Sequence, residues 1–446
     1  MDQIRTWLLA AAVFLSPFAS VGVLHALTGR DLGAGLQPAF VPLLLLIFME
    51  FLRRLRERRL APGEAIILVA LLWTALAASL TWSVTDMGLA GERPWSKSLK
   101  QLVQWVFFVL AAVAAARAME RISWRPVERA LSIGLLCSIL VAVAAAISGP
   151  GAASLPGLDT NPSIASGSDE LYLGHSFTGL SRLRGPMPEP LMFGSYLLAA
   201  VPLVAAAAMA RRGRARWWRL ATALLGAACL IATWSRGAWL GAAVATLVMA
   251  VPLLRAAPGR PRLRSLCIGG IAVAGAGLLT LSFLLQVAPW EMADLFLRRA
   301  GQSVATHDMS NMTRFWSWKV AWEGFLQAPI AGQGWGSYGF FYFRQVTGAA
   351  SGAHFGWPVP NNFALLLLAE SGIVGLSLWS LSLWPALRGL GAPSMRRVVL
   401  AGAIVGVLVQ MATFSQWNLP HIWLLFAAGI AAGTLASGQA GVEEVG

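Results

Sequence analysis

The chain is built from apolar runs separated by short polar connections, and its arginines gather in every second connection. Each run is about twenty residues long, the length an α-helix needs to cross the hydrocarbon core of a bilayer. With 57% hydrophobic and 12% charged residues, the chain has too little polar surface for a soluble domain. We therefore predict an all-α integral membrane protein with about twelve transmembrane helices. The runs lie near residues 7–27, 35–52, 64–83, 97–118, 127–148, 190–210, 217–234, 237–254, 266–288, 361–387, 398–416 and 419–436.

The arginine clusters set the orientation of these helices. They follow the second, fourth, sixth, eighth and tenth runs, and the positive-inside rule makes those connections cytoplasmic. Both termini are then cytoplasmic as well. The net charge of +14 is thus a topology signal and does not indicate nucleic-acid binding. Because Cys137, Cys229 and Cys267 fall in or beside apolar runs, no disulfide framework, metal site or cofactor is predicted.

Two long connections interrupt this pattern, and both fall on the outer side. Residues 149–189 are rich in proline and glycine turns, and residues 289–360 contain an amphipathic segment at 313–325. The aromatic residues of that segment recur at helical spacing, so we expect a helix lying along the membrane interface. The chain is predicted to form a single polytopic membrane domain, residues 1–446, capped outside the cytoplasm by the two loops.

One arginine lies where a charge is costly. Arg236 falls within the very apolar stretch 230–241, in a short connection between two runs. A guanidinium cannot lie cheaply in hydrocarbon, and so short a connection cannot carry it far into water. Arg236 is therefore held at the level of the lipid headgroups, where the phosphates of a lipid-linked substrate would lie.

The other charges argue against a transporter. Ion-coupled transporters carry buried carboxylates or broken helices near the middle of the bilayer, often in repeated halves. Here Glu50 and Glu370 lie toward the ends of their runs, no internal repeat is visible, and no broken helix is predicted. Chemistry at the membrane surface is favoured over transport.

Four motifs carry a resemblance to a known family. They are Arg184-Gly185-Pro186 with Pro188-Glu189-Pro190; Ser235-Arg236-Gly237-Ala238; Arg314-Phe315-Trp316 with the stretch 329–338; and Asn361-Asn362 followed, after nine residues, by Gly372-Ile373-Val374-Gly375. In order, spacing and topology, these motifs resemble those of the O-antigen ligase and Wzy-type polysaccharide polymerase superfamily of bacterial envelope glycosyltransferases.

The resemblance implies a fold and a reaction. The fold is an all-helical bundle of the GT-C class with a periplasmic cap, in the bacterial inner membrane. The reaction is a metal-independent, inverting transfer from an undecaprenyl-diphosphate-linked glycan to an acceptor hydroxyl. The implied partners are this lipid-linked glycan, membrane lipid, and a chain-length regulator and flippase of the export machinery.

Within this superfamily we favour polymerisation of O-antigen or exopolysaccharide repeat units, because the ligases carry a histidine where this chain has Asn361. The alternative is an O-antigen ligase that moves a finished glycan to a lipid A core or another acceptor. Two further alternatives are a non-catalytic partner of the export machinery and a lipid-glycan flippase.

The resemblance also assigns roles to arginines. Arg236 and Arg314 match the family's two arginines, and Arg184 is a third candidate. Their planar guanidinium groups can bind the donor's diphosphate and stabilise the charge that develops on the leaving group. The alternative for each is an interfacial arginine that reaches toward lipid headgroups.

Asn361 departs from the family pattern, because an amide cannot take up a proton at neutral pH. The two other candidates for the base are His354, in the same loop, and Glu189. Alternatively, His354 is a solvated loop residue and Glu189 is held at a helix start by the helix dipole. Asn361 and Asn362 either take part in the reaction or cap the tenth helix.

The last candidates are a carboxylate and two indoles. Glu370 lies about two turns into the tenth run, and either orients an arginine or forms a structural ion pair. Trp234 and Trp335 flank the predicted site and are candidates for glycan contact, whereas most other tryptophans are typical of an interfacial belt. The glycine-rich stretch 332–336 is predicted to form a tight turn, since no strand precedes it.

Overall fold

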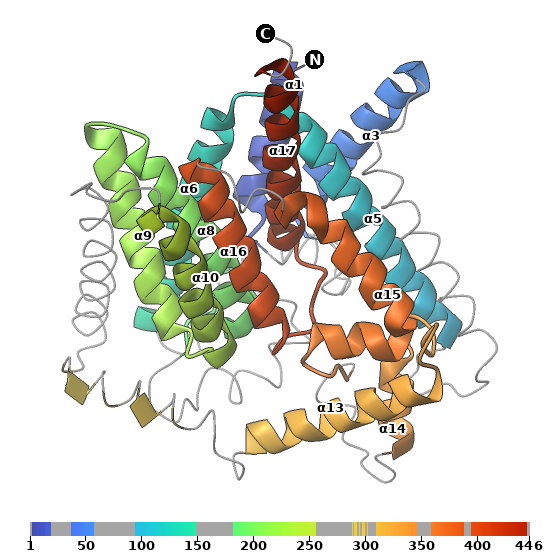
Figure 1. The fold of residues 1–446 in the computed structure, drawn as a ribbon. Coiled ribbons are helices and arrows are strands. Elements are labelled where there is room, and N and C mark those ends of the chain that lie inside the picture. The colour runs from blue at the N-terminus through green and yellow to red at the C-terminus, as the bar shows by residue number, and fades with distance from the viewer. Residues whose placement is uncertain are drawn as a thin grey trace.

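In the computed structural model the described residues form helices joined by turns, with no strand among them (Figure 1). The structure describes residues 2–18, 37–57, 94–148, 182–255, 309–345, 358–387 and 394–443, and a few residues between 288 and 301. The helices are α1 (Asp2–Leu15), α3 (Phe40–Glu57), α5 (Pro94–Arg121), α6 (Trp124–Ser148), α8 (Pro190–Met209), α9 (Arg214–Ala232), α10 (Arg236–Arg255), α13 (Met309–Gln327), α14 (Tyr338–Gln345), α15 (Phe363–Leu387), α16 (Met395–Met411) and α17 (Pro420–Glu443).

The helical membrane fold is confirmed. Within the described residues, four helices are long and apolar enough to cross a membrane: Trp95–Arg121 in α5, Trp124–Ala144 in α6, Pro190–Met209 in α8 and Phe363–Trp384 in α15. The predicted runs at 64–83 and 266–288 lie outside the described residues. The total of about twelve spans therefore stays a prediction, as do the orientation and the periplasmic cap.

Small residues allow α10 and α16 to pack closely. A Cβ placed on Gly241 would lie 2.5 Å from the carbonyl oxygen of Gly406, and one placed on Gly406 would lie 2.9 Å from that of Gly241. Such small-residue contacts are the usual means by which membrane helices approach one another. This packing fixes the first turn of α10, which carries Arg236, against the end of α16.

A cluster of tryptophans lies in the core between α5, α15 and α17. The ring of Trp105 lies 4.9 Å from that of Trp335, 5.0 Å from that of Trp417, and 5.5 Å from those of Trp379 and Trp423. All five side chains are buried. The interfacial belt predicted for most tryptophans is therefore wrong for Trp105, Trp379, Trp417 and Trp423, because these rings are buried against neighbours from distant parts of the chain.

Helix α15 is broken at Gly372, contrary to our expectation of an unbroken helix. Gly372 has φ 64°, and a Cβ there would lie 2.2 Å from the carbonyl oxygen of Ile330. An L-residue is strained at this φ, so the break depends on glycine. The break divides α15 into two arms, the first of which lies beside α13 and ends near the start of α14 (Figure 1).

The segment 329–334 fills this break. The amides of Ile373 and Val374 donate to the carbonyls of Pro329 and Ile330, at 2.9 and 3.4 Å. The carbonyls of Ala369 and Glu370 accept instead from Gln333 and Gly334, both at 2.9 Å. In an unbroken helix these four groups would have bonded to one another. The third and fourth sequence motifs thus interlock, and these four backbone groups freed by the break are satisfied.

Helix α13 lies across the end of the bundle opposite the two termini (Figure 1). Phe315, Trp316 and Trp322 are exposed on it, whereas Val320 and Ala321 are buried beneath. The helix expected at 313–325 is therefore present with three aromatic side chains facing outward, and its place at a membrane interface stays a prediction.

Candidate functional site

A polar cavity of about 370 Å³ lies at the end of the bundle that α13 crosses. It is lined by the first turns of α5, the start of α8, the first arm of α15, and the connection from α16 to α17. Two predicted site residues, Glu189 and Glu370, face this one cavity. Among the described residues, no group of three histidine, cysteine or carboxylate side chains is placed to hold a metal ion.

Helix α5 contributes a polar stripe that the sequence analysis missed. Lys97, Lys100, Gln101 and Gln104 line the cavity at helical spacing. The apolar run from residue 97 was assigned as a membrane span without regard to this spacing. Its two ammonium groups and two amides can donate hydrogen bonds to a phosphate or to a sugar hydroxyl.

Glu370 is held rigidly in the cavity wall. Its side chain is 1% exposed, and its Oε1 accepts a hydrogen bond from the amide of Tyr338 at 3.2 Å. The positive charge that acts on it is Lys97, where we had considered an arginine. Its Oε2 has no hydrogen-bond partner in the described part of the chain. A buried carboxylate oxygen without a partner is available to a ligand donor.

Glu189 stands immediately before α8, where Pro190 begins the helix. Its side chain makes no capping hydrogen bond and lines the cavity instead. Burial raises the pKa of Glu189 above its ordinary value of 4.5, and the charge of Arg182 opposes this. Arg182 is itself anchored, because its Nε donates to the carbonyl of Thr233 at 3.1 Å.

Arg236 is the first residue of α10 and reaches α13. Its Nη2 donates to Oδ1 of Asn311 at 2.9 Å, and Asn311 is buried at the start of α13. Arg314 follows Asn311 by three residues, which is about one helical turn. The structure therefore brings the two predicted arginines to adjacent parts of one corner. Asn311 was not predicted, because nothing in the sequence marks it as the link.

The turn between α9 and α10 is connected to the cavity by residues 182–189. The amide of Leu183 donates to the carbonyl of Ala232 at 3.0 Å, at the end of α9. The same segment then passes Arg184, which is 7% exposed, and enters the cavity at Pro188 and Glu189. The segment 182–189 thus links the turn beside Arg236 to the polar cavity, whose lining does not include Arg236 or Arg314.

The asparagine pair has a structural explanation in part. Asn362 caps α15, because its Oδ1 accepts from the amide of Leu365 at 3.1 Å, and its own amide donates to Oγ of Ser415 at 2.7 Å. Asn361 has φ 50°, a conformation that asparagine tolerates better than most residues. Since Ser415 lines the cavity, the pair lies beside it. His354 lies outside the described residues.

The two indoles proposed for glycan contact are buried. Trp335 is fully buried in the tryptophan cluster, and Trp234 is 2% exposed and packs against Trp239 at 5.8 Å between ring centres. Trp234 also has φ 51°, which sharpens the turn before Arg236. Their burial favours a packing role over contact with substrate.

Residues 221–380 match the O-antigen ligase family model. The resemblance found in the sequence is thereby confirmed. The match runs from α9 to α15 and includes Arg236, Arg314 and the break at Gly372. Arg184 and Glu189 precede the matched segment. No curated protein sequence matches the chain.

Proposed function

We propose that the chain is a membrane glycosyltransferase that takes its glycan from an undecaprenyl-diphosphate donor at the periplasmic face and polymerises repeat units. The observation that carries this proposal is that the segment 182–189 links the turn beside Arg236 to the polar cavity that contains Glu189 and Glu370. These two parts combine cationic side chains for a diphosphate with amides and carboxylates for sugar hydroxyls. Most of these groups lie at one end of the bundle, where headgroups of lipid-linked molecules would be.

The cationic groups have a defined task in such a transfer. As the glycosidic bond to phosphate breaks, negative charge accumulates on the leaving diphosphate. Arg236 and Arg314 provide positive charge for it, and Lys97 and Lys100 in the polar cavity add a positive potential that attracts the anionic donor. Arg236 also lies at the N-terminus of α10, where backbone amides and the helix dipole favour an anion.

The acceptor reacts through its hydroxyl oxygen, which bonds to the anomeric carbon as the carbon–oxygen bond to the diphosphate breaks. The bonding electron pair leaves with undecaprenyl diphosphate, and the hydroxyl proton passes to a base. We assign that base to Glu189, because it faces the cavity and its pKa is raised by burial. The hydrogen-bonded Glu370 then positions the acceptor sugar.

A ligase activity is the second candidate, favoured by the description of the matched family model as O-antigen ligase. The donor chemistry is the same in both, and only the acceptor differs. Purified protein in proteoliposomes, given undecaprenyl-diphosphate-linked repeat units, distinguishes them on a gel. A ladder of lengthening products supports the polymerase, and a single shift that requires added lipid A core supports the ligase. No product in either reaction, from protein with wild-type thermal stability, refutes both.

A further inference from the structure

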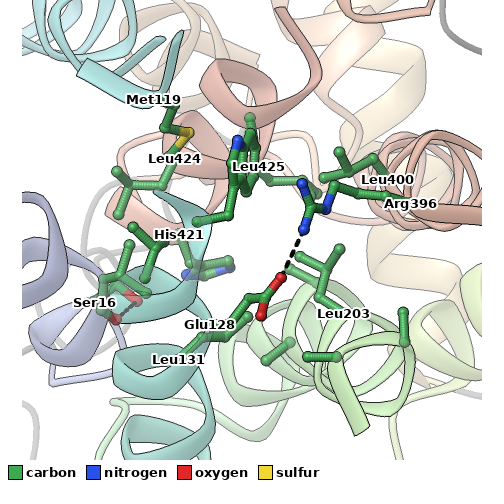
Figure 2. Close-up of a pocket in the computed structure, with 18 of the residues that line it drawn as sticks. Ser16, Met119, Glu128, Leu131, Leu203, Arg396, Leu400, His421, Leu424 and Leu425 are labelled. Atoms are coloured by element: carbon green, nitrogen blue, oxygen red, sulfur yellow. Dashed lines mark hydrogen bonds and ion pairs between the residues drawn. The ribbon is translucent and has the colours of Figure 1, made fainter. Parts of the chain in front are cut away.

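A second cavity, of about 300 Å³, lies between helices and reaches the end of α8 and the start of α16 (Figure 2). It is enclosed by the end of α5, the starts of α6 and α16, the first half of α17 and one face of α8. That face of α8 runs from Tyr196 to Ala210, a length of roughly 20 Å. Alanines predominate on it, so the space between the helices is left open.

The interior of this cavity suits a hydrocarbon chain. Leu131, Leu203, Leu400 and Leu425 line it together with the alanines of α8 (Figure 2). Its volume is about twice that of an engineered apolar cavity of ~150 Å³, which stays dry and binds benzene. Ser16, Tyr196 and His421 also line it, but most of its lining is apolar, and such a space between membrane helices is filled more favourably by lipid chain than by water.

A charged cluster stands at one end of the cavity. The carboxylate of Glu128 accepts from Arg396 at 2.9 Å and from Arg211 at 3.0 Å. Figure 2 shows Glu128 and Arg396 facing each other beside the leucines. The side chain of Arg396 is 49% exposed, so this end of the cavity reaches the surface. One carboxylate paired with two guanidinium groups leaves the cluster with excess positive charge.

Further positive charge lies beside this cluster, with hydrogen-bond donors that no described residue satisfies. Arg219 is 5% exposed, and Arg211, Glu128 and Arg129 all act on it electrostatically. Its Nε and Nη1, and the Nε of Arg211, have no acceptor among the residues described. Buried charged donors are costly when they are unpaired. Three such donors, near an opening to an apolar cavity, indicate a missing anion.

We propose that this cavity binds one acyl chain of an anionic phospholipid, with the lipid phosphate held by Arg211 and Arg219. A phosphate accepts several charge-assisted hydrogen bonds from guanidinium groups, which matches the free donors. Basic pockets between membrane helices on the cytoplasmic side are suited to anionic headgroups, and the arginine clusters predict that orientation here. The site is distinct from the polar cavity and does not depend on the proposed glycosyl transfer.

The test is lipid retention by the purified protein. Protein is extracted in mild detergent, stripped of lipid, and incubated separately with phosphatidylglycerol, phosphatidylethanolamine or undecaprenyl phosphate, and bound lipid is measured by native mass spectrometry. We expect phosphatidylglycerol to be retained at least tenfold more strongly than phosphatidylethanolamine. Ala206→Leu, which fills the cavity, and Arg219→Gln, which removes the charge, should each reduce retention of phosphatidylglycerol about tenfold.

Matched controls keep this test decisive. Ala205→Leu adds the same volume at a neighbouring position that does not line the cavity, and Arg214→Gln removes an exposed arginine of α9. Both should retain lipid as the wild type does. Arg219→Lys restores the charge if Arg219→Gln does not fold. Equal retention of the two phospholipids, preference for undecaprenyl phosphate, or no retention by folded protein would each overturn the proposal.

Discussion

Replacing Gly372 by alanine tests how the broken helix supports the site. Because Gly372 has φ 64° and ψ −168°, a region that essentially only glycine occupies, alanine introduces backbone strain of roughly 2 kcal/mol. Its Cβ would also lie 2.2 Å from the carbonyl oxygen of Ile330, so the segment 329–334 must move. That segment is held by four backbone hydrogen bonds, each contributing ~1 kcal/mol. If two are lost, Gly372→Ala lowers the free energy of unfolding by roughly 3–4 kcal/mol.

The same change should impair activity, because the amide of Tyr338 that binds Glu370 follows the displaced segment. We would measure the midpoint of thermal unfolding in detergent and product formation in proteoliposomes. Gly324→Ala is the matched control, since a Cβ there meets only Ala369, at 3.8 Å, and α13 gains a better helix former. A Gly372→Ala protein with the midpoint and activity of the wild type would refute the interlock as the support of Glu370.

Three further outcomes are expected from the site. Arg236→Ala should abolish product at unchanged protein level, and Arg236→Lys should restore only part of the rate because a lysine cannot bind phosphate bidentately. Full activity of the alanine variant would show that Arg236 does not bind the diphosphate. Lys97→Ala should raise the KM for the lipid-linked donor at least tenfold, and an unchanged KM contradicts its role. If Glu189 is the base, the rate rises with pH as its carboxyl loses its proton. Arg182→Ala removes the charge that lowers the pKa of Glu189, so the acidic limb of the pH–rate profile should move to higher pH. An acidic limb that does not move excludes Glu189 as the base.

Local sequence signals predicted the helices well. Every predicted run that falls on described residues overlaps a helix, because an apolar run of membrane length is a property of consecutive residues. The arginine Arg236 was likewise found from its immediate neighbours. The break in α15 was not predicted, because it depends on the contact of Gly372 with a segment about forty residues earlier in the chain. The hydrophobic periodicity of a sequence does not reveal such a contact.

The site was predicted only in part, for the same reason. Glu189 and Glu370 were proposed separately, and only the fold places them on one cavity. Asn311 was invisible, since its importance comes from a partner on another helix. The stripe of Lys97 and Lys100 was within reach, because two lysines and two glutamines at helical spacing in a predicted membrane span are unusual.

The tryptophan cluster around Trp105 gives the protein a spectroscopic reporter of its own. Rings this close couple electronically, so they should produce a strong, chiral near-ultraviolet signal that depends on fixed tertiary packing. The rings belong to α5, α15, α17 and the connections before α14 and α17. Loss of this near-ultraviolet signal at constant helix content would therefore report, without any label, that these parts have separated while the helices themselves stay formed.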